Sequence, residues 1–139
     1  MPPWSVMEYP AKSMARYLGD SQNGARRFRI EVDGEDGGAV SIRHPWLKGF
    51  YLEFLAVPPE FQNQGVGAGI LGWFEQKALR QEARNLWVCA SSFNARALLF
   101  YERQGFRGVA ALPSLVVDGY DEILLRKFPL GGASGPSHA

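Results

Sequence analysis

Cysteine and histidine are scarce in this chain, and that scarcity excludes several kinds of site. The 139 residues include one cysteine, Cys89, and two histidines, His44 and His138, which lie far apart in the sequence. A lone cysteine cannot close an internal disulfide, and these three residues do not have the spacing of a zinc site. We therefore expect no metal site and a cytoplasmic location, where thiols stay reduced.

Long apolar runs and an excess of one charge are also absent. No stretch approaches the roughly eighteen uninterrupted apolar residues of a membrane helix, and no cationic stretch followed by an apolar run opens the sequence. The 15 Lys and Arg residues are interleaved with 14 Asp and Glu residues, so no basic stripe forms. We expect a small partner, and neither nucleic acid nor a membrane.

Length and pattern predict one domain over residues 1–130. Its core is expected at about residues 27–128, after a short N-terminal segment, 1–20, that offers only a weak helix at 11–18. Residues 131–139 lack core side chains and are expected to form a disordered tail.

Alternating and helical patterns divide the core into segments. Strands are predicted at residues 27–33, 39–43, 50–57, 86–90 and 121–128, and helices at 66–81 and 95–104. Connections at 34–38 and 44–49 should join the first three strands into an antiparallel meander. Residues 50–57 are apolar on both faces apart from Glu53, which is typical of a central strand covered by helices on both sides.

The loop before the first predicted helix is suited to binding phosphate. It reads Gln-Asn-Gln-Gly-Val-Gly over residues 62–67, and its glycines let backbone N–H groups turn inward at the positive end of the helix dipole. A plain glycine turn is the alternative. Residues 67–72 also match the dinucleotide fingerprint Gly-x-Gly-x-x-Gly, but nine residues separate Val57 from Gly67 and the glycines fall inside the helix. A nicotinamide-dependent oxidoreductase is therefore disfavoured.

Two blocks of sequence resemble one known family. Residues 55–67, Leu-Ala-Val-Pro-Pro-Glu-Phe-Gln-x-x-Gly-x-Gly, resemble the acetyl-CoA loop of the GNAT superfamily of N-acetyltransferases, and residues 94–106 resemble a later motif of that family. The resemblance implies an α+β acyl-CoA N-acyltransferase fold, with a mixed, mostly antiparallel sheet flanked by helices and splayed after the central strand 50–57. The family usually opens with a strand and a helix pair, whereas only residues 1–20 precede the first clear strand here.

The resemblance also assigns residues to acetyl-CoA, the co-substrate. Loop amides would hold its pyrophosphate, the strand edge would bond its pantetheine arm, and the Val57 amide could polarise the thioester carbonyl. Asn94 would contact the CoA arm, cap its helix, or do both. The expected cofactor-binding residues are Leu55, Ala56, Val57, Gln62, Asn63, Gln64, Gly65, Val66, Gly67, Ala68 and Asn94.

Transfer to an amine calls for a base, because freeing the lone pair of a lysine-like amine at neutral pH costs about 4 to 5 kcal/mol. Glu53 is the candidate base, since it matches a glutamate that many family members use, directly or through water. On a regular strand it would share a face with Tyr51, Leu55 and Val57, and desolvation would raise its pKa. The alternative role is an ion pair with Arg43.

Tyr101 matches the family tyrosine that donates a proton or hydrogen bond to the departing thiolate of CoA; it could instead be a core residue. Cys89 as a nucleophile is disfavoured, because it lies in a buried-looking strand. The rival to an acetyl-CoA-dependent N-acetyltransferase is a catalytically silent CoA-binding or interaction module.

The sequence leaves the acceptor open between a small-molecule amine and a peptide amine. Four apolar residues are expected to shape either the acceptor pocket or the contact of a homodimer: Trp46, Leu47, Phe50 and Tyr51.

Overall fold

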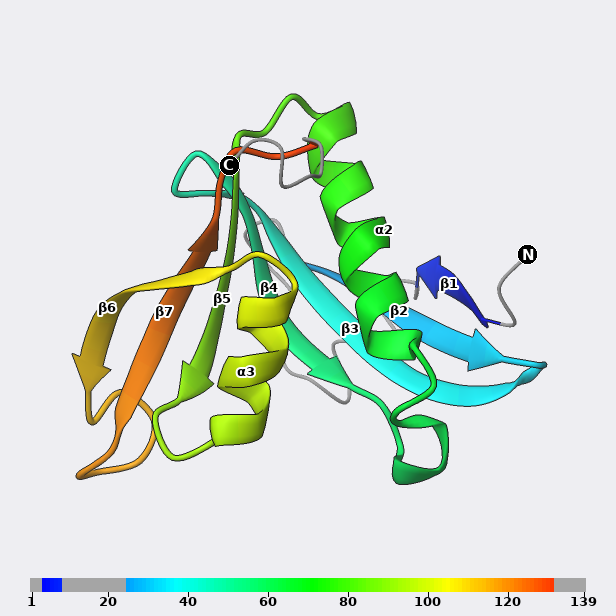
Figure 1. Cartoon of the computed structure of the whole chain (residues 1–139). Helices are drawn as coiled ribbons and strands as arrows, with labels where there is room; N and C mark the ends of the chain where they lie inside the picture. Colours follow the sequence, from blue (N-terminus) through cyan, green and yellow to red (C-terminus); the bar gives the residue numbers. More distant parts are fainter. Residues whose placement is uncertain (1–3, 9–24, 132–139) are drawn as a thin grey trace.

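The computed structural model describes residues 4–8 and 25–131 (Figure 1). Its strands are β1 (Trp4–Glu8), β2 (Ala25–Val32), β3 (Glu35–Trp46), β4 (Gly49–Ala56), β5 (Asn85–Ser91), β6 (Arg107–Pro113) and β7 (Asp121–Lys127). Its helices are the short 3-10 helix η1 (Pro59–Phe61), α2 (Val66–Arg80) and α3 (Ala95–Arg103). The helix expected at 11–18 and the tail at 132–139 lie outside the described residues.

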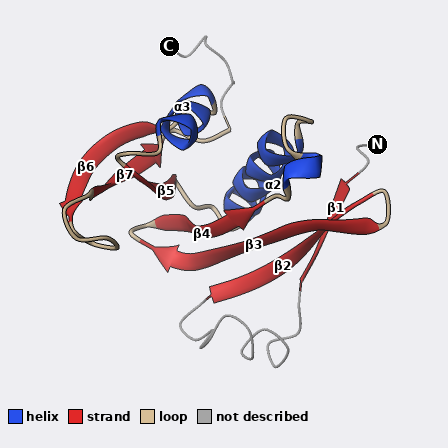
Figure 2. Cartoon of the chain, turned by 90° about the horizontal axis from the view of Figure 1, so that it is seen from below, coloured by secondary structure: helices blue, strands red, loops and turns tan. Residues whose placement is uncertain are grey.

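The strands form one sheet in the order β1-β2-β3-β4-β5-β7-β6. The β4–β5 pair is parallel and every other pair is antiparallel. This confirms the mixed, mostly antiparallel sheet, and the sheet does not close on itself. Helices α2 and α3 both lie on the same face of it (Figure 2).

Helix α2 carries the core on that face. Its apolar residues recur three and four positions apart, so one stripe of the helix faces the sheet. Ile70, Phe74 and Ala78 are fully buried, and the Phe74 ring meets Phe50 of β4 edge-on at 6.2 Å. The predicted amphipathic helix is therefore confirmed.

Strand β3 is longer than the sequence predicts. It runs from Glu35 to Trp46, so the turn before it shrinks and the connection after it is only Leu47 and Lys48. Both residues have positive φ, 44° and 63°, as a tight hairpin turn with the twist of its strands requires. Leucine and lysine carry no turn signal, which is why the sequence predicts a longer connection.

Two strands escape sequence-based prediction altogether. Strand β1 pairs only with β2, and β6 pairs only with β7, so both are edge strands. Strand β6 is exposed along most of its length and contains Gly108 and Pro113. Edge strands tolerate such residues and need no alternating pattern, so periodicity does not detect them.

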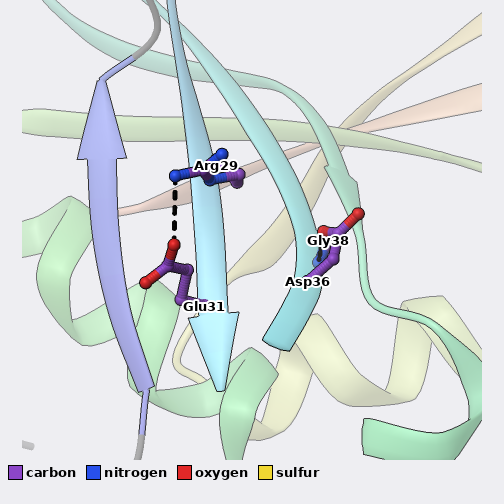
Figure 3. A network of polar contacts seen from close by, with 4 residues as sticks. All are labelled: Arg29, Glu31, Asp36 and Gly38. Atoms are coloured by element: carbon purple, nitrogen blue, oxygen red, sulfur yellow. Dashed lines mark hydrogen bonds and ion pairs between the residues drawn. The ribbon is translucent and has the colours of Figure 1, made fainter. Parts of the chain in front are cut away.

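Each strand of the β2–β3 hairpin contains one short polar contact between residues of that strand (Figure 3). Arg29 Nη2 donates to Glu31 Oε2 at 3.0 Å, and the Gly38 N–H donates to Asp36 Oδ1 at 3.1 Å. Gly38 has φ of 114°, and a Cβ there would lie 1.9 Å from the carbonyl oxygen of Ala56. Only glycine lets β3 approach the end of β4 this closely.

A β-bulge at Glu53 changes the direction of β4. Ser41 of β3 opposes Phe54 and Ile42 opposes Leu52, which leaves Glu53 as the extra residue. Pairing of β4 with β5 ends at Leu52, and the two strands then diverge (Figure 1). The expected splay after the central strand is thus present, and it begins at the bulge.

Because of the bulge, the prediction that Glu53 shares a face with Leu55 is wrong. Leu55 opposes Val40, a buried residue of the helix-covered face, whereas Tyr51 opposes Arg43 on the other face. Glu53 therefore shares a face with Tyr51 but not with Leu55, because the extra residue reverses the alternation.

Candidate functional site

A cavity of about 550 Å³ lies where β4 leaves β5, between the starts of α2 and α3. Its wall consists of Leu55, Val57, Gln62, Asn63, Gly65, Gly67, Ala68, Asn94, Arg96, Ala97, Phe100 and Tyr101. The strand end, the glycine loop and the second motif thus meet at one place, although about thirty residues separate the two motifs in sequence.

The N-terminus of α2 presents unpaired backbone donors to this cavity. The first helical bond runs from the Gly69 N–H to the Gly65 carbonyl at 2.9 Å, so the amides of Val66, Gly67 and Ala68 have no partner within the helix. Gly65 has φ of 81°, no side chain caps the helix, and no acidic residue occupies its first turn. These amides and the helix dipole are therefore available to an anion.

Gly67 keeps this wall of the cavity open. A Cβ at Gly67 would lie 3.2 Å from the ring of Phe100, the α3 residue across the cavity. A larger side chain would have to project into the space between α2 and α3. The cradle therefore fits a phosphate group held by backbone atoms.

Three of the expected cofactor-binding residues do not line the cavity with their side chains. The Val66 side chain is buried in the core, Gln64 Nε2 donates to the Glu60 carbonyl at 2.7 Å, and Ala56 is exposed at the end of β4. Their expected roles rest on backbone groups alone. Asn94 lines the cavity and also caps α3, because its Oδ1 accepts from the Ala97 N–H at 3.0 Å.

The cavity includes α3 residues that sequence reasoning missed. Arg96 Nη2 donates to Asn63 Oδ1 at 3.1 Å and places a guanidinium at the rim. Ala97 and Phe100 share a helix face with Tyr101 at spacings of three and four residues, and that periodicity could have found them. Arg96 had no comparable signal in the sequence.

Glu53 lies on the opposite face of the sheet and does not line the cavity. Its Oε1 accepts from Ser41 Oγ at 2.7 Å and its Oε2 accepts from Arg43 Nε at 2.6 Å. The ion pair offered as the alternative is thus present. Since Arg43 and Glu53 are each about a quarter exposed, the carboxylate remains reachable from solvent.

Tyr101, Cys89 and Tyr51 all have raised pKa values. Burial, reinforced by nearby Cys89, raises the pKa of Tyr101. Burial also raises the pKa of Cys89, although a hydrogen bond donated by Tyr51 acts in the opposite direction. Burial, then Cys89 and more weakly Glu53, raise the pKa of Tyr51. All three groups therefore stay protonated at neutral pH, and Tyr101 keeps a proton to donate.

These shifts predict a loss of stability at alkaline pH. A raised folded-state pKa means that, above the ordinary value, the unfolded chain releases protons that the folded chain retains. The free energy of unfolding should fall as pH rises above 9.0, the ordinary value for Cys89, and further above 10.0 for Tyr51 and Tyr101. Urea unfolding across this range measures the slope, and Tyr51→Phe should make it shallower. An unchanged slope in that variant would contradict the buried setting of Tyr51.

Aromatic side chains cluster on the Glu53 face, beside the paired part of β4 and β5. Trp46 stacks on Tyr51 at 4.5 Å and meets Trp87 edge-on at 5.8 Å. Of the four residues expected at an acceptor pocket or dimer contact, Phe50 is buried beneath α2 and points to the other face, so it cannot serve there. Leu47 is exposed at the hairpin tip.

Within residues 4–8 and 25–131, no helix is long and apolar enough to cross a membrane. No group of three or more His, Cys, Asp or Glu residues in the described part of the chain could hold a metal ion.

Comparison with known proteins gives concordant matches. The model of the acetyltransferase (GNAT) family matches residues 2–106. The ribosomal protein bS18-alanine N-acetyltransferase of Escherichia coli (strain K12) is 25% identical over 130 residues, which cover 92% of this chain and 82% of that protein.

Two solved structures illustrate the shared fold. A GNAT acetyltransferase from Elizabethkingia anophelis with acetyl-CoA bound has a TM-score of 0.77 at 17% identity, with 92% of this chain and 99% of that chain covered. The ribosomal-protein-S18-alanine N-acetyltransferase from Escherichia coli has a TM-score of 0.73 at 17% identity, with 95% and 97% covered.

Proposed function

The chain belongs to the acetyltransferase (GNAT) family, and we propose that it transfers the acetyl group of acetyl-CoA to a primary amine by direct attack in a ternary complex. The observation that carries this proposal is the arrangement around the splay. Free amides at the start of α2 and Tyr101 line one cavity, and Glu53 lies at the bulge on the opposite face. Acetyl-CoA would enter from the helix side and the amine from the other.

The unpaired amides at the start of α2, those of Val66, Gly67 and Ala68, form a nest that would hold the pyrophosphate. The Arg96 guanidinium would add positive charge at the rim. The β4 edge beyond Leu52 has no partner on β5, so its backbone is free to pair with the pantetheine arm. The Val57 amide would polarise the thioester carbonyl. Binding on this side rests mainly on backbone groups.

In the chemical step, the amine nitrogen attacks the thioester carbon, the C–N bond forms and the C–S bond breaks. Glu53, directly or through a water molecule, accepts the proton that the nitrogen loses. Arg43 and Ser41 hold the carboxylate in place by the two hydrogen bonds described above. Tyr101 gives its proton, or a hydrogen bond, to the departing sulfur and regains the proton from solvent. The products are an N-acetylated amine and CoA.

The acceptor proposed for the first trial is the N-terminal amine of a peptide. The E. coli relative acts on an alanine of ribosomal protein bS18, as its name states, and the amine that an alanine residue can offer is the α-amine at a chain terminus. Its identity to this chain is only 25%, so polyamines and free amino acids belong in the same trial.

The experiment is a calorimetric titration with acetyl-CoA and, separately, with NAD, followed by an amine screen that detects released CoA thiol. We expect acetyl-CoA to bind, NAD not to bind, and at least one amine to be acetylated. If acetyl-CoA binds but no amine is acetylated, the chain is a CoA-binding module. If acetyl-CoA does not bind, the transferase proposal fails.

Replacing Tyr101 with phenylalanine should slow turnover without abolishing it. A thiol has a pKa of about 8.5, so its anion leaves unaided at a moderate rate, and a proton donor adds roughly tenfold to a hundredfold. Steady-state kinetics should show a lower kcat at an unchanged dissociation constant for acetyl-CoA. An unchanged kcat would mean that Tyr101 donates no proton and is a core residue instead.

A further inference from the structure

Glu122 is a buried carboxylate that the mechanism above does not use. It lies on β7 and is only 8% exposed. Its Oε2 accepts a hydrogen bond from Ser91 Oγ on the neighbouring strand β5. Among the described residues, no Lys, Arg or His forms an ion pair with it, whereas Glu31, Glu53 and Glu75 each have a cationic partner.

Glu122 lies one strand beyond the opening between β4 and β5, and its carboxylate reaches the edge of that opening through the hydrogen bond from Ser91. It stands opposite Ser91, two residues beyond Cys89 on the part of β5 that no longer pairs with β4. The negative charge of Glu122 contributes to raising the pKa of Tyr51 and of Cys89. Glu53 also contributes to the raised pKa of Tyr51.

A carboxylate in this setting favours a cation beside it. Burial removes most of its hydration, and one hydroxyl replaces only part of that loss. Glu53 has Arg43 to neutralise it, but Glu122 has only Ser91.

We infer that Glu122 binds the ammonium group of the acceptor in the opening between β4 and β5, so that the acceptor arrives as a cation. This inference rests on the proposed function and deepens it. The ammonium ion is held at Glu122 and gives its first proton to Glu53, which releases that proton to solvent and then accepts the second one as the amine attacks. The two carboxylates therefore have different roles: Glu122 binds the ammonium group, and Glu53 deprotonates it.

Binding without turnover tests this role directly. With CoA bound in place of acetyl-CoA, n-butylammonium and its uncharged analogue n-butanol can be titrated against tryptophan fluorescence. We expect the wild type to bind n-butylammonium about tenfold or more tightly than n-butanol, because a hydrogen-bonded charge pair supplies that preference. Glu122→Gln keeps the shape of the side chain and should lose the preference. No preference in the wild type, or an unchanged one in Glu122→Gln, would overturn the inference.

Kinetics and stability separate recognition from a structural role. With the amine found in the screen, Glu122→Gln should raise the KM for the amine about tenfold or more and leave the KM for acetyl-CoA unchanged. Its melting temperature should equal or exceed that of the wild type, because an unneutralised buried charge is removed. A lower melting temperature with an unchanged amine KM would assign Glu122 to the structure alone.

Glu75→Gln is the matched control. Glu75 is also poorly exposed, but it accepts from Lys127 Nζ and from the Gly131 N–H, both at 2.7 Å, far from the opening. This variant should lose stability and keep the amine KM, the reverse of Glu122→Gln. If n-butylammonium binding depends on Glu122 but the protein acetylates no amine, the transferase proposal is wrong and the cation site at Glu122 is supported.

Discussion

Gly67→Trp should abolish measurable binding of acetyl-CoA. A Cβ at Gly67 already lies 3.2 Å from the Phe100 ring, so the indole must enter the cavity or push α2 and α3 apart. In either case the pyrophosphate can no longer reach the backbone N–H donors. Hydrogen bonds to a charged group contribute about 1.5 to 3 kcal/mol each, so losing two corresponds to a hundredfold or greater rise in the dissociation constant. Calorimetry measures the dissociation constant of acetyl-CoA.

Gly72→Trp is the control for this substitution. Gly72 lies on the same helix, is exposed, and has no atom within 4 Å of the position of a Cβ. The two variants add the same side chain to α2 and differ in whether it meets the cavity. Gly72→Trp should bind acetyl-CoA as the wild type does. Equal losses in the two variants, or a Gly67→Trp protein that fails to unfold cooperatively, would mean that the helix rather than the nest has been damaged.

Most of the residues that line the cavity between α2 and α3 could be predicted from sequence. Its two motifs are local: Gly65 and Gly67 must precede a helix to form a nest, and Asn94 must begin one. A glycine loop or a helix cap depends on neighbouring residues in the sequence, so it can be recognised before the fold is known. The cavity therefore contains most of the expected residues, and it adds Arg96, whose role depends on the packing of α3 against the loop at Asn63.

The Glu53 face could not be predicted in the same way, because its arrangement depends on the pairing of distant strands. Alternation alone places Glu53 beside Leu55, but the bulge against Ser41 and Ile42 reverses the faces after it. Glu122 had no signal at all. Its importance comes from lying opposite Ser91, at the point where β5 has left β4, and no pattern within residues 121–128 reveals that.

Glu53→Gln should lower kcat about a hundredfold, the usual contribution of a positioned general base, and leave acetyl-CoA binding unchanged. The amide oxygen can still accept from Arg43 Nε, and the Ser41 hydroxyl can turn to accept from the amide NH2, so the bulge should persist, but the amide cannot take up a proton at neutral pH. The loss should therefore appear in the chemical step. Single-turnover acetylation with enzyme saturated by acetyl-CoA measures that step separately from product release.

Glu31→Gln provides the comparison for this base. Glu31 also pairs with an arginine, Arg29, on the same sheet at 3.0 Å, but on β2, away from the splay (Figure 3). Removing its charge should leave the single-turnover rate unchanged. A Glu53→Gln rate equal to that of Glu31→Gln would show that the Arg43 pair is structural and that another group removes the proton. A specific loss in Glu53→Gln, with a normal melting curve, would identify the bulged carboxylate as the base.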